Sequence, residues 1–490
     1  MVMPETLDAP VQKQSRARTV ALVGGLVAIV AGTAAAGVGW TTLSRLNGGG
    51  PQPESVLPAD TVAFMKVDMN PSAGQKVAAV RFALRFPEAK GKVTETSDLR
   101  KVAFDQMKQD AKLKDVDYAA DVEPWLGERF AVGLLPGATS KDKPIAVAVL
   151  AVTDEDKAAE ALPRITGSGK TACGVRDGFA ICSEDHTVVT LLTEAEQGTT
   201  LAESQQFAAD MDALGEDGVA AAWVDLKRVG EVADAARLGR GLLGTGLLGA
   251  PIPDAPQGGR VAVALRFAGP HLELVGHVTD MPHAWPDRRG SGTGVTDLPA
   301  GTLGAFGLSD ASEQVKAGWA SSGDARKNLQ EAERELGVSL PDDLYAALGD
   351  RAAVAYGGLE DDQLRVALRT DGDPAAVGRF VKGLNSSGKG FSAVHQAAAG
   401  DDPVVATTED YASEIARGSG LGEMDAFREA VPGAKDARAV LYLDIAGLVK
   451  EHGKDLDAKE RQRFEPFSAL GISTHGEGKT AEFTVRLTTR

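Results

Sequence analysis

Hydrophobic and polar residues alternate along two stretches of the chain that have nearly the same sequence. The first reads LPADTVAF over residues 57–64, and the second reads LPAGTLGAF over residues 298–306. Alternation of this kind is typical of a half-buried β-strand, so each stretch predicts a turn followed by a strand. After each copy, further runs of strand and helix type follow in the same order, which indicates one long unit made twice.

Four further pairs of blocks recur in the same order and support this repeat. The paired blocks are residues 121–132 with 343–354, 149–154 with 366–371, Val188-Val189 and Thr193-Glu194 with Val404-Val405 and Thr408-Glu409, and 222–225 with 441–444. The period is far longer than that of a solenoid repeat, which is about 20–50 residues. The sequence therefore predicts a tandem duplication.

The predicted elements favour an α+β fold with mainly antiparallel sheets, because strands outnumber helices and come partly as hairpins. In both units, glycine in a Leu-Gly-acid-Arg block predicts a helix end that leads into a strand. Asp154 and Asp371 follow strands and predict the caps of the next helices. Residues 187–192, which read TVVTLL, predict a strand.

The predicted organisation has six parts. They are a cytoplasmic tail (1–18), a transmembrane helix (19–40), a flexible linker (41–56), the first α+β unit (57–280), a linker (281–297) and the second α+β unit (298–490).

Residues 19–40 contain no charged residue. About 20 apolar residues in a helix span a bilayer core of roughly 30 Å. Lys13, Arg16 and Arg18 precede the segment, so the positive-inside rule places residues 1–18 in the cytoplasm and the body outside. A cleaved signal peptide is the alternative, because Ala34-Ala35-Ala36 fits a cleavage site, but the apolar run exceeds a typical signal core. Both interpretations place the body outside the cytoplasm.

The two cysteines, Cys173 and Cys182, flank a predicted hairpin. Asp177-Gly178 is a favoured two-residue turn between apolar runs. Counting outward from this turn pairs Cys173 with Cys182 at a non-hydrogen-bonded position, where Cα atoms lie about 4.5 Å apart. The sequence therefore predicts a structural disulfide, which forms in an oxidising compartment. A redox-active pair is disfavoured because the C-x-x-C spacing is missing.

The chain of 490 residues has 52 basic and 69 acidic residues and a net charge of −17. Such an acidic body repels phosphate backbones, so nucleic acid is excluded as an expected partner.

No short motif predicts a catalytic, metal or cofactor site. Gly169-Lys170-Thr171 resembles the end of a phosphate-binding loop, but Arg164 stands where that loop requires glycine. His271, Glu273 and His277 alternate on one strand face and span too far for one zinc ion, so we expect a solvated strand face. Scattered catalytic carboxylates remain an open alternative.

One apolar, glycine-rich stretch, residues 238–253, has two interpretations. It is either a buried crossover or a loop that contacts lipid or a partner. The second interpretation would use four leucines, Leu242, Leu243, Leu247 and Leu248.

The predicted anchor, the L-P-A-D-T strand opening and the repeated α+β body resemble the bacterial membrane-anchored family catalogued as domain of unknown function 3352. The resemblance covers residues 57–490. It implies an anchored envelope protein, and it supplies no activity, substrate or site residue.

These observations favour a non-catalytic binding or protein-interaction module, anchored in the membrane through residues 19–40, whose ligand or envelope partner is unknown. One alternative is a cell-wall-directed hydrolase or transferase, which requires two carboxylates in a cleft. The other is a structural or assembly-supporting envelope protein, which requires an exposed apolar patch.

Overall fold

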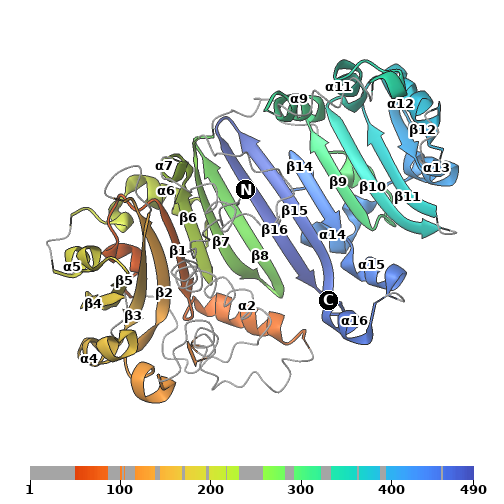
Figure 1. The fold of residues 1–490 in the computed structure, drawn as a ribbon. Coiled ribbons are helices and arrows are strands. Elements are labelled where there is room, and N and C mark those ends of the chain that lie inside the picture. Colours follow the sequence, from red (N-terminus) through yellow and green to blue (C-terminus); the bar gives the residue numbers. More distant parts are fainter. Residues whose placement is uncertain are drawn as a thin grey trace, which may run out of the picture. The chain divides into compact units, whose positions relative to one another are not determined.

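The computed structural model describes most of the chain after residue 49 (Figure 1). The described residues are 50–86, 100–101, 104, 116–137, 144–167, 171–194, 198–216, 218–230, 258–281, 292–321, 333–360, 363–386, 393–453 and 456–490. They form two compact units, called unit 1 and unit 2 below, which divide between Arg266 and Phe267.

The described part of unit 1 has seven strands in the antiparallel order β4-β5-β3-β2-β1-β6-β7. The strands are β1 (Ala63–Asp68), β2 (Leu126–Leu135), β3 (Ile145–Val152), β4 (Ala172–Arg176), β5 (Phe179–Ser183), β6 (Ala220–Asp225) and β7 (Arg260–Ala268). The helices are η1 (Pro53–Val56), α2 (Ala73–Ala83), η3 (Tyr118–Val122), α4 (Glu155–Thr166), α5 (His186–Glu194), η4 (Leu201–Glu203), α6 (Gln205–Asp212) and α7 (Leu226–Gly230).

Unit 2 repeats this order as β12-β13-β11-β10-β9-β14-β15 and continues with β16 and β8. The strands are β8 (His271–Thr279), β9 (Gly304–Ser309), β10 (Arg351–Glu360), β11 (Gln363–Thr370), β12 (His395–Ala399), β13 (Asp402–Ala406), β14 (Ala439–Leu443), β15 (Phe467–Glu477) and β16 (Thr480–Thr489). The helices are η5 (Val295–Asp297), α9 (Ala311–Ser321), α11 (Asp342–Leu348), α12 (Pro374–Ser386), α13 (Glu409–Arg417), η6 (Leu421–Glu423), α14 (Asp425–Ala430), α15 (Ile445–His452) and α16 (Ala458–Phe464).

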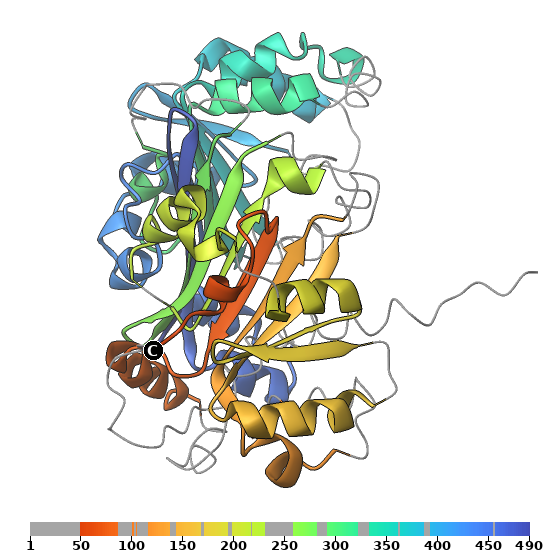
Figure 2. The ribbon, with the colours of Figure 1, turned by 90° about the vertical axis from the view of Figure 1, so that its left-hand side faces the viewer.

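This arrangement confirms a mixed α+β fold with antiparallel sheets. In unit 1, alternate residues of β1 serve two faces of the sheet. Val67 joins the buried apolar cluster beneath α4, with Phe130 and Leu162. Phe64 points to the other face and packs on α6. The hairpin of β4 and β5 packs against α4 and α5 (Figures 1 and 2).

The disulfide prediction is confirmed. Cys173 and Cys182 face each other across the hairpin with a Cα–Cα distance of 4.1 Å. Asp177 and Gly178, the turn residues, both have positive φ angles, of 50° and 78°. This conformation suits a tight hairpin turn, so the turn fixes the register that places the two sulfur atoms together.

The strand predicted over residues 187–192 is wrong, because these residues lie in helix α5. The Asp185 Oδ1 atom accepts hydrogen bonds from the backbone N–H groups of Thr187 and Val188, which starts a helix. Val189 and Leu192 then share its buried face at helical spacing. The equivalence of Val188-Val189 with Val404-Val405 is therefore also wrong, since the second pair lies on strand β13.

Of the two predicted aspartate caps, Asp154 is confirmed and Asp371 is wrong. The Asp154 side chain accepts from the Lys157 N–H at the start of α4. Asp371 instead accepts from the backbone N–H groups of Asp350 and Arg351, next to β10. The predicted glycine helix end is confirmed at Gly349, after α11, and is wrong at Gly127, which lies inside β2.

No helix among the described residues is long and apolar enough to cross a membrane. The predicted transmembrane segment 19–40 and the predicted tail 1–18 lie outside the described residues.

Candidate functional site

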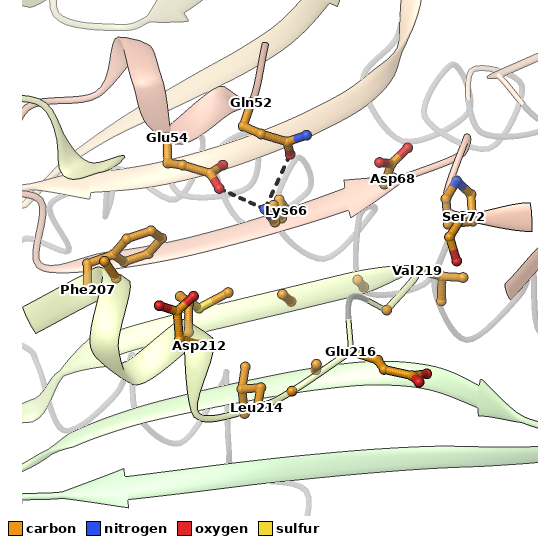
Figure 3. Close-up of a pocket in the computed structure, with 18 of the residues that line it drawn as sticks. Gln52, Glu54, Lys66, Asp68, Ser72, Phe207, Asp212, Leu214, Glu216 and Val219 are labelled. Carbon is orange, nitrogen blue, oxygen red and sulfur yellow. Dashed lines mark hydrogen bonds and ion pairs between the residues drawn. The ribbon is translucent and has the colours of Figure 1, made fainter. Parts of the chain in front are cut away.

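A pocket of about 410 Å³ lies on the α6 side of the sheet in unit 1 (Figure 3). Strands β1, β6 and β7 contribute its floor. Lys66 of β1 faces Ala221 of β6, and Ala221 faces Ala264 of β7. All three residues line the pocket, and the small alanine side chains leave space above the strands beside the lysine.

Helix α6 forms one wall of the pocket, and an aromatic cluster holds it in place. Phe207 packs edge-on against Phe64 and Trp223, with ring centroids 5.6 Å apart in each pair. Trp223 Nε1 donates to Asp210 Oδ2 at 2.9 Å, and Arg260 Nε donates to the same oxygen at 2.6 Å. These contacts fix α6 to β6 and β7, so the wall is rigidly supported.

The short helix η4 fixes where α6 begins. The Thr200 backbone N–H donates to Glu203 Oε2 at 2.8 Å, and the Thr200 hydroxyl donates to the same oxygen at 3.1 Å. These two hydrogen bonds hold the pKa of Glu203 below its usual value. The Ser204 side chain then caps α6 by accepting from the Phe207 N–H.

The charged centre of the pocket is an ion pair between Lys66 and Glu54. Lys66 Nζ donates to Glu54 Oε1 at 2.7 Å and to Gln52 Oε1 at 3.3 Å, as Figure 3 shows. Glu54 belongs to η1 and is only 8% exposed. Its second oxygen, Oε2, is buried and has no hydrogen-bond donor among the described residues. A buried carboxylate oxygen without a donor is energetically costly, so this atom could accept a hydrogen bond from a bound molecule.

The other acidic groups of the pocket differ in how they are compensated. Asp68 Oδ2 accepts from Arg129 Nε at 2.9 Å, and Asp68 Oδ1 accepts from the Asn70 N–H at 2.7 Å. Asp212 and Glu216 are exposed and lie on the side of the pocket opposite Glu54 (Figure 3). Neither of these two carboxylates forms an ion pair with another described residue. The pocket therefore carries excess negative charge.

The equivalent place in unit 2 is closed and holds no charged side chain. Counting from Leu57 and Leu298, which open the two repeats, Glu54 corresponds to Val295 and Lys66 corresponds to Gly307. The backbone supports this equivalence, because the Leu57 and Leu298 carbonyls accept from the first residues of η4 and η6. Val295 is fully buried.

Val295 packs so closely on Gly307 that a larger residue there would displace its neighbours. A Cβ atom on Gly307 would lie 2.4 Å from Val295 Cγ2 and 2.9 Å from Thr293 Cβ. Thr293 and Ser309 take the positions that Gln52 and Asp68 hold in unit 1. The three charged residues Glu54, Lys66 and Asp68 are thus all replaced by uncharged ones.

The residues singled out in the sequence do not line this pocket. Cys173 and Cys182 lie on the β4–β5 hairpin. The four leucines proposed for lipid or partner contact, Leu242, Leu243, Leu247 and Leu248, lie outside the described residues.

The prediction of a solvated face at His271, Glu273 and His277 is wrong, because the two histidine side chains are only 13% and 14% exposed and Glu273 is buried. Glu273 is 2% exposed and forms an ion pair with Arg486. His271 Nδ1 accepts from the Thr489 N–H. In the part of the chain that the structure describes, no three His, Cys, Asp or Glu side chains gather as metal ligands.

Sequence reasoning missed the pocket for two reasons. Glu54 lies in a stretch that reads as linker, and Lys66 is a single charge in an otherwise ordinary strand. The available signal was the difference between the repeats, since a Glu–Lys pair in one copy corresponds to Val–Gly in the other.

Fold and pocket together define an α+β protein with antiparallel sheets and a polar, acidic pocket in its first unit. Residues 22–215 match the family model described as "Protein of unknown function (DUF3352)", so this stretch of the chain is similar to that family. The match confirms the resemblance seen in the sequence, and it covers residues 22–215 rather than the expected 57–490. No curated protein and no solved structure matches the chain.

Proposed function

We propose that this protein is a binding module of the bacterial cell envelope and that the pocket of unit 1 is its binding site. The observation that carries the proposal is the buried Glu54 Oε2 atom, which lacks a donor among the described residues in a pocket that unit 2 fills with Val295. A polar cavity that the fold does not require is better explained by a ligand than by stability.

The hydrogen bonds of Glu54 and Asp68, the two inner carboxylates of the pocket, favour binding over hydrolysis. Glycoside hydrolysis requires one carboxyl group that donates a proton to the leaving group. In the pocket, Glu54 accepts from Lys66, and Asp68 accepts from Arg129 and from the Asn70 N–H. Both groups act as acceptors, which suits a recognition site rather than an acid catalyst.

We further infer a tandem duplication, with an anchor at residues 19–40 and the body outside the cytoplasm. The repeated blocks and the shared strand order support the duplication. The uncharged segment and the three basic residues before it support the anchor and its orientation. A disulfide in unit 1 fits an oxidising compartment.

Native mass spectrometry of the full chain, extracted in detergent from its own envelope, tests the binding function. We expect additional mass that leaves when the protein unfolds. The matched control is the double variant Glu54→Val with Lys66→Gly, which gives unit 1 the residues of unit 2. It should fold and lack the additional mass. Wild-type protein that carries no additional mass contradicts the function, and a control that retains the mass contradicts the site.

Protease treatment of intact spheroplasts tests the topology. The body should be digested from outside, while a tag at the N-terminus stays protected until the membrane is opened. Protection of the body in intact spheroplasts contradicts the proposed orientation.

A further inference from the structure

We propose that the pocket of unit 1 takes a small organic cation, namely a primary amine carried on a short aliphatic body. This inference rests on the proposed binding function and names the chemical class of the ligand.

The charges around the pocket select against anions. Lys66 is the only basic residue among those that line it, whereas Glu54, Asp68, Asp212 and Glu216 are acidic. Lys66 is paired with Glu54, and Arg129 compensates Asp68 from outside the lining. Asp212 and Glu216 form no side-chain ion pair among the described residues, and the nearby Arg266 Nη1 donates to the backbone carbonyls of Leu214 and Glu216. Carboxylates therefore outnumber cations at the mouth, which attracts positive charge and repels carboxylates and phosphates.

The buried Glu54 Oε2 atom is a hydrogen-bond acceptor, so it favours a ligand that carries a hydrogen-bond donor. Lys66 binds Oε1 of Glu54, and the second oxygen stays without a donor among the described residues. An ammonium group supplies N–H donors and a positive charge, and a charge-assisted hydrogen bond to a carboxylate is about twice as strong as a neutral one. A hydroxyl group would satisfy the same oxygen and leave the charge of the mouth uncompensated.

The remaining walls of the pocket are apolar and favour a ligand with hydrocarbon groups. Phe207, Met211 and Leu214 line the pocket on the side of α6, opposite the alanines of the floor. Methylene groups of a bound amine would be removed from water against these side chains, which favours binding by about 25 cal/mol per Å² of apolar surface. With a volume of about 410 Å³, the pocket suits a short chain rather than a long acyl group.

Isothermal titration calorimetry on the full chain in detergent tests this class with three probes of equal length. The probes are 1,5-diaminopentane, 1,5-pentanediol and glutarate, which present ammonium, hydroxyl and carboxylate groups on similar chains. We expect the diamine to bind at least about tenfold more tightly than the diol, and glutarate not to bind. Equal binding of diamine and diol, or tighter binding of glutarate, overturns the proposal.

Two variants and one control test which residues of the pocket are responsible for diamine binding. Glu54→Gln removes the buried charge and should weaken diamine binding by about ten- to a hundredfold. Asp212→Asn with Glu216→Gln changes only exposed residues, and it should weaken binding and reduce its dependence on salt. Glu160→Gln, an exposed position on α4 whose side chain is 76% accessible, is the matched control and should bind as the wild type does.

These measurements separate the ligand class from the binding function. If Glu54→Gln fails to fold by circular dichroism, the exposed double variant still decides the role of charge. If the diamine does not bind and the native mass measurement still finds a ligand that the control variant loses, the amine class is wrong and the binding function stands. If neither experiment shows a bound molecule, both proposals are wrong.

Discussion

Unit 1 and unit 2 share one strand order and differ in what lies between the first strand and the short helix before it. In unit 1 this space holds the Glu54–Lys66 ion pair and opens into a pocket. In unit 2, Val295 packs on Gly307 and the space is closed. The difference shows that the strand order tolerates both solutions, so the polar residues of unit 1 are not needed to build the sheet.

On the opposite face of the sheet, apolar side chains are more exposed in unit 2 than in unit 1. Met65 and Val132 form a cross-strand pair in unit 1, and Phe306 and Val354 form the corresponding pair in unit 2. Val132 is 8% exposed, whereas Phe306 and Val354 are 44% and 39% exposed. In unit 2, the face that corresponds to the pocket is therefore closed, and the opposite face exposes more apolar surface.

The largest expected effect comes from placing the carboxylate of unit 1 into unit 2. Val295→Glu buries a charge where Gly307 offers no cation, and the unfolding free energy of unit 2 should fall by about 3–5 kcal/mol. Urea denaturation followed by circular dichroism measures this loss. Val295→Ala, which removes apolar volume without adding charge, is the control and should cost less. A loss below about 1 kcal/mol for the glutamate would show that unit 2 can accommodate the charge.

A smaller effect is expected when the closed space of unit 2 is overfilled. Gly307→Ala places a Cβ atom 2.4 Å from Val295 Cγ2, so neighbouring side chains must shift at a cost of about 1–3 kcal/mol. Gly301→Ala is the matched control, because a Cβ atom added at that position would have no neighbouring atom within 4 Å. Equal stability of the two variants in the same denaturation experiment contradicts the tight packing.

The disulfide offers a third difference between the units. The hairpin of β12 and β13 places Gln396 opposite Val405, where unit 1 has its two cysteines. Replacing Cys173 and Cys182 by serine together should lower the stability of unit 1 by about 2 kcal/mol, because the closed loop is short. Unit 2 should unfold as before. A shift in both unfolding transitions would mean that the hairpin stabilises more than its own unit.

The smallest effect concerns the exposed apolar pair. Val354→Thr should change the unfolding free energy by no more than about 0.5 kcal/mol, because the side chain is already 39% exposed. Val132→Thr buries a hydroxyl at the equivalent position of unit 1 and should cost about 1 kcal/mol or more. Thermal unfolding of the two variants provides the comparison, and similar losses would contradict the difference in burial.

Local signals in the sequence predicted the elements that local chemistry decides. The turn at Asp177-Gly178 set the hairpin register, and Asp154 marked the start of α4. The β-branched residues of α5 misled the prediction, because a capping aspartate and helical burial outweighed their strand propensity. The pocket depends on η1 folding over β1, a tertiary contact that brings Glu54 to Lys66 and that no local pattern encodes.

Strand β4 is the last strand of the described sheet in unit 1. Edge strands present unpaired backbone groups, and an edge strand that detaches can add to another molecule and begin strand exchange. The Cys173–Cys182 bond joins β4 to β5, so β4 cannot leave its partner and insert into a neighbouring chain. The bond thus hinders polymerisation through exchange of β4 alone, a restraint that is lost when the cysteines are reduced.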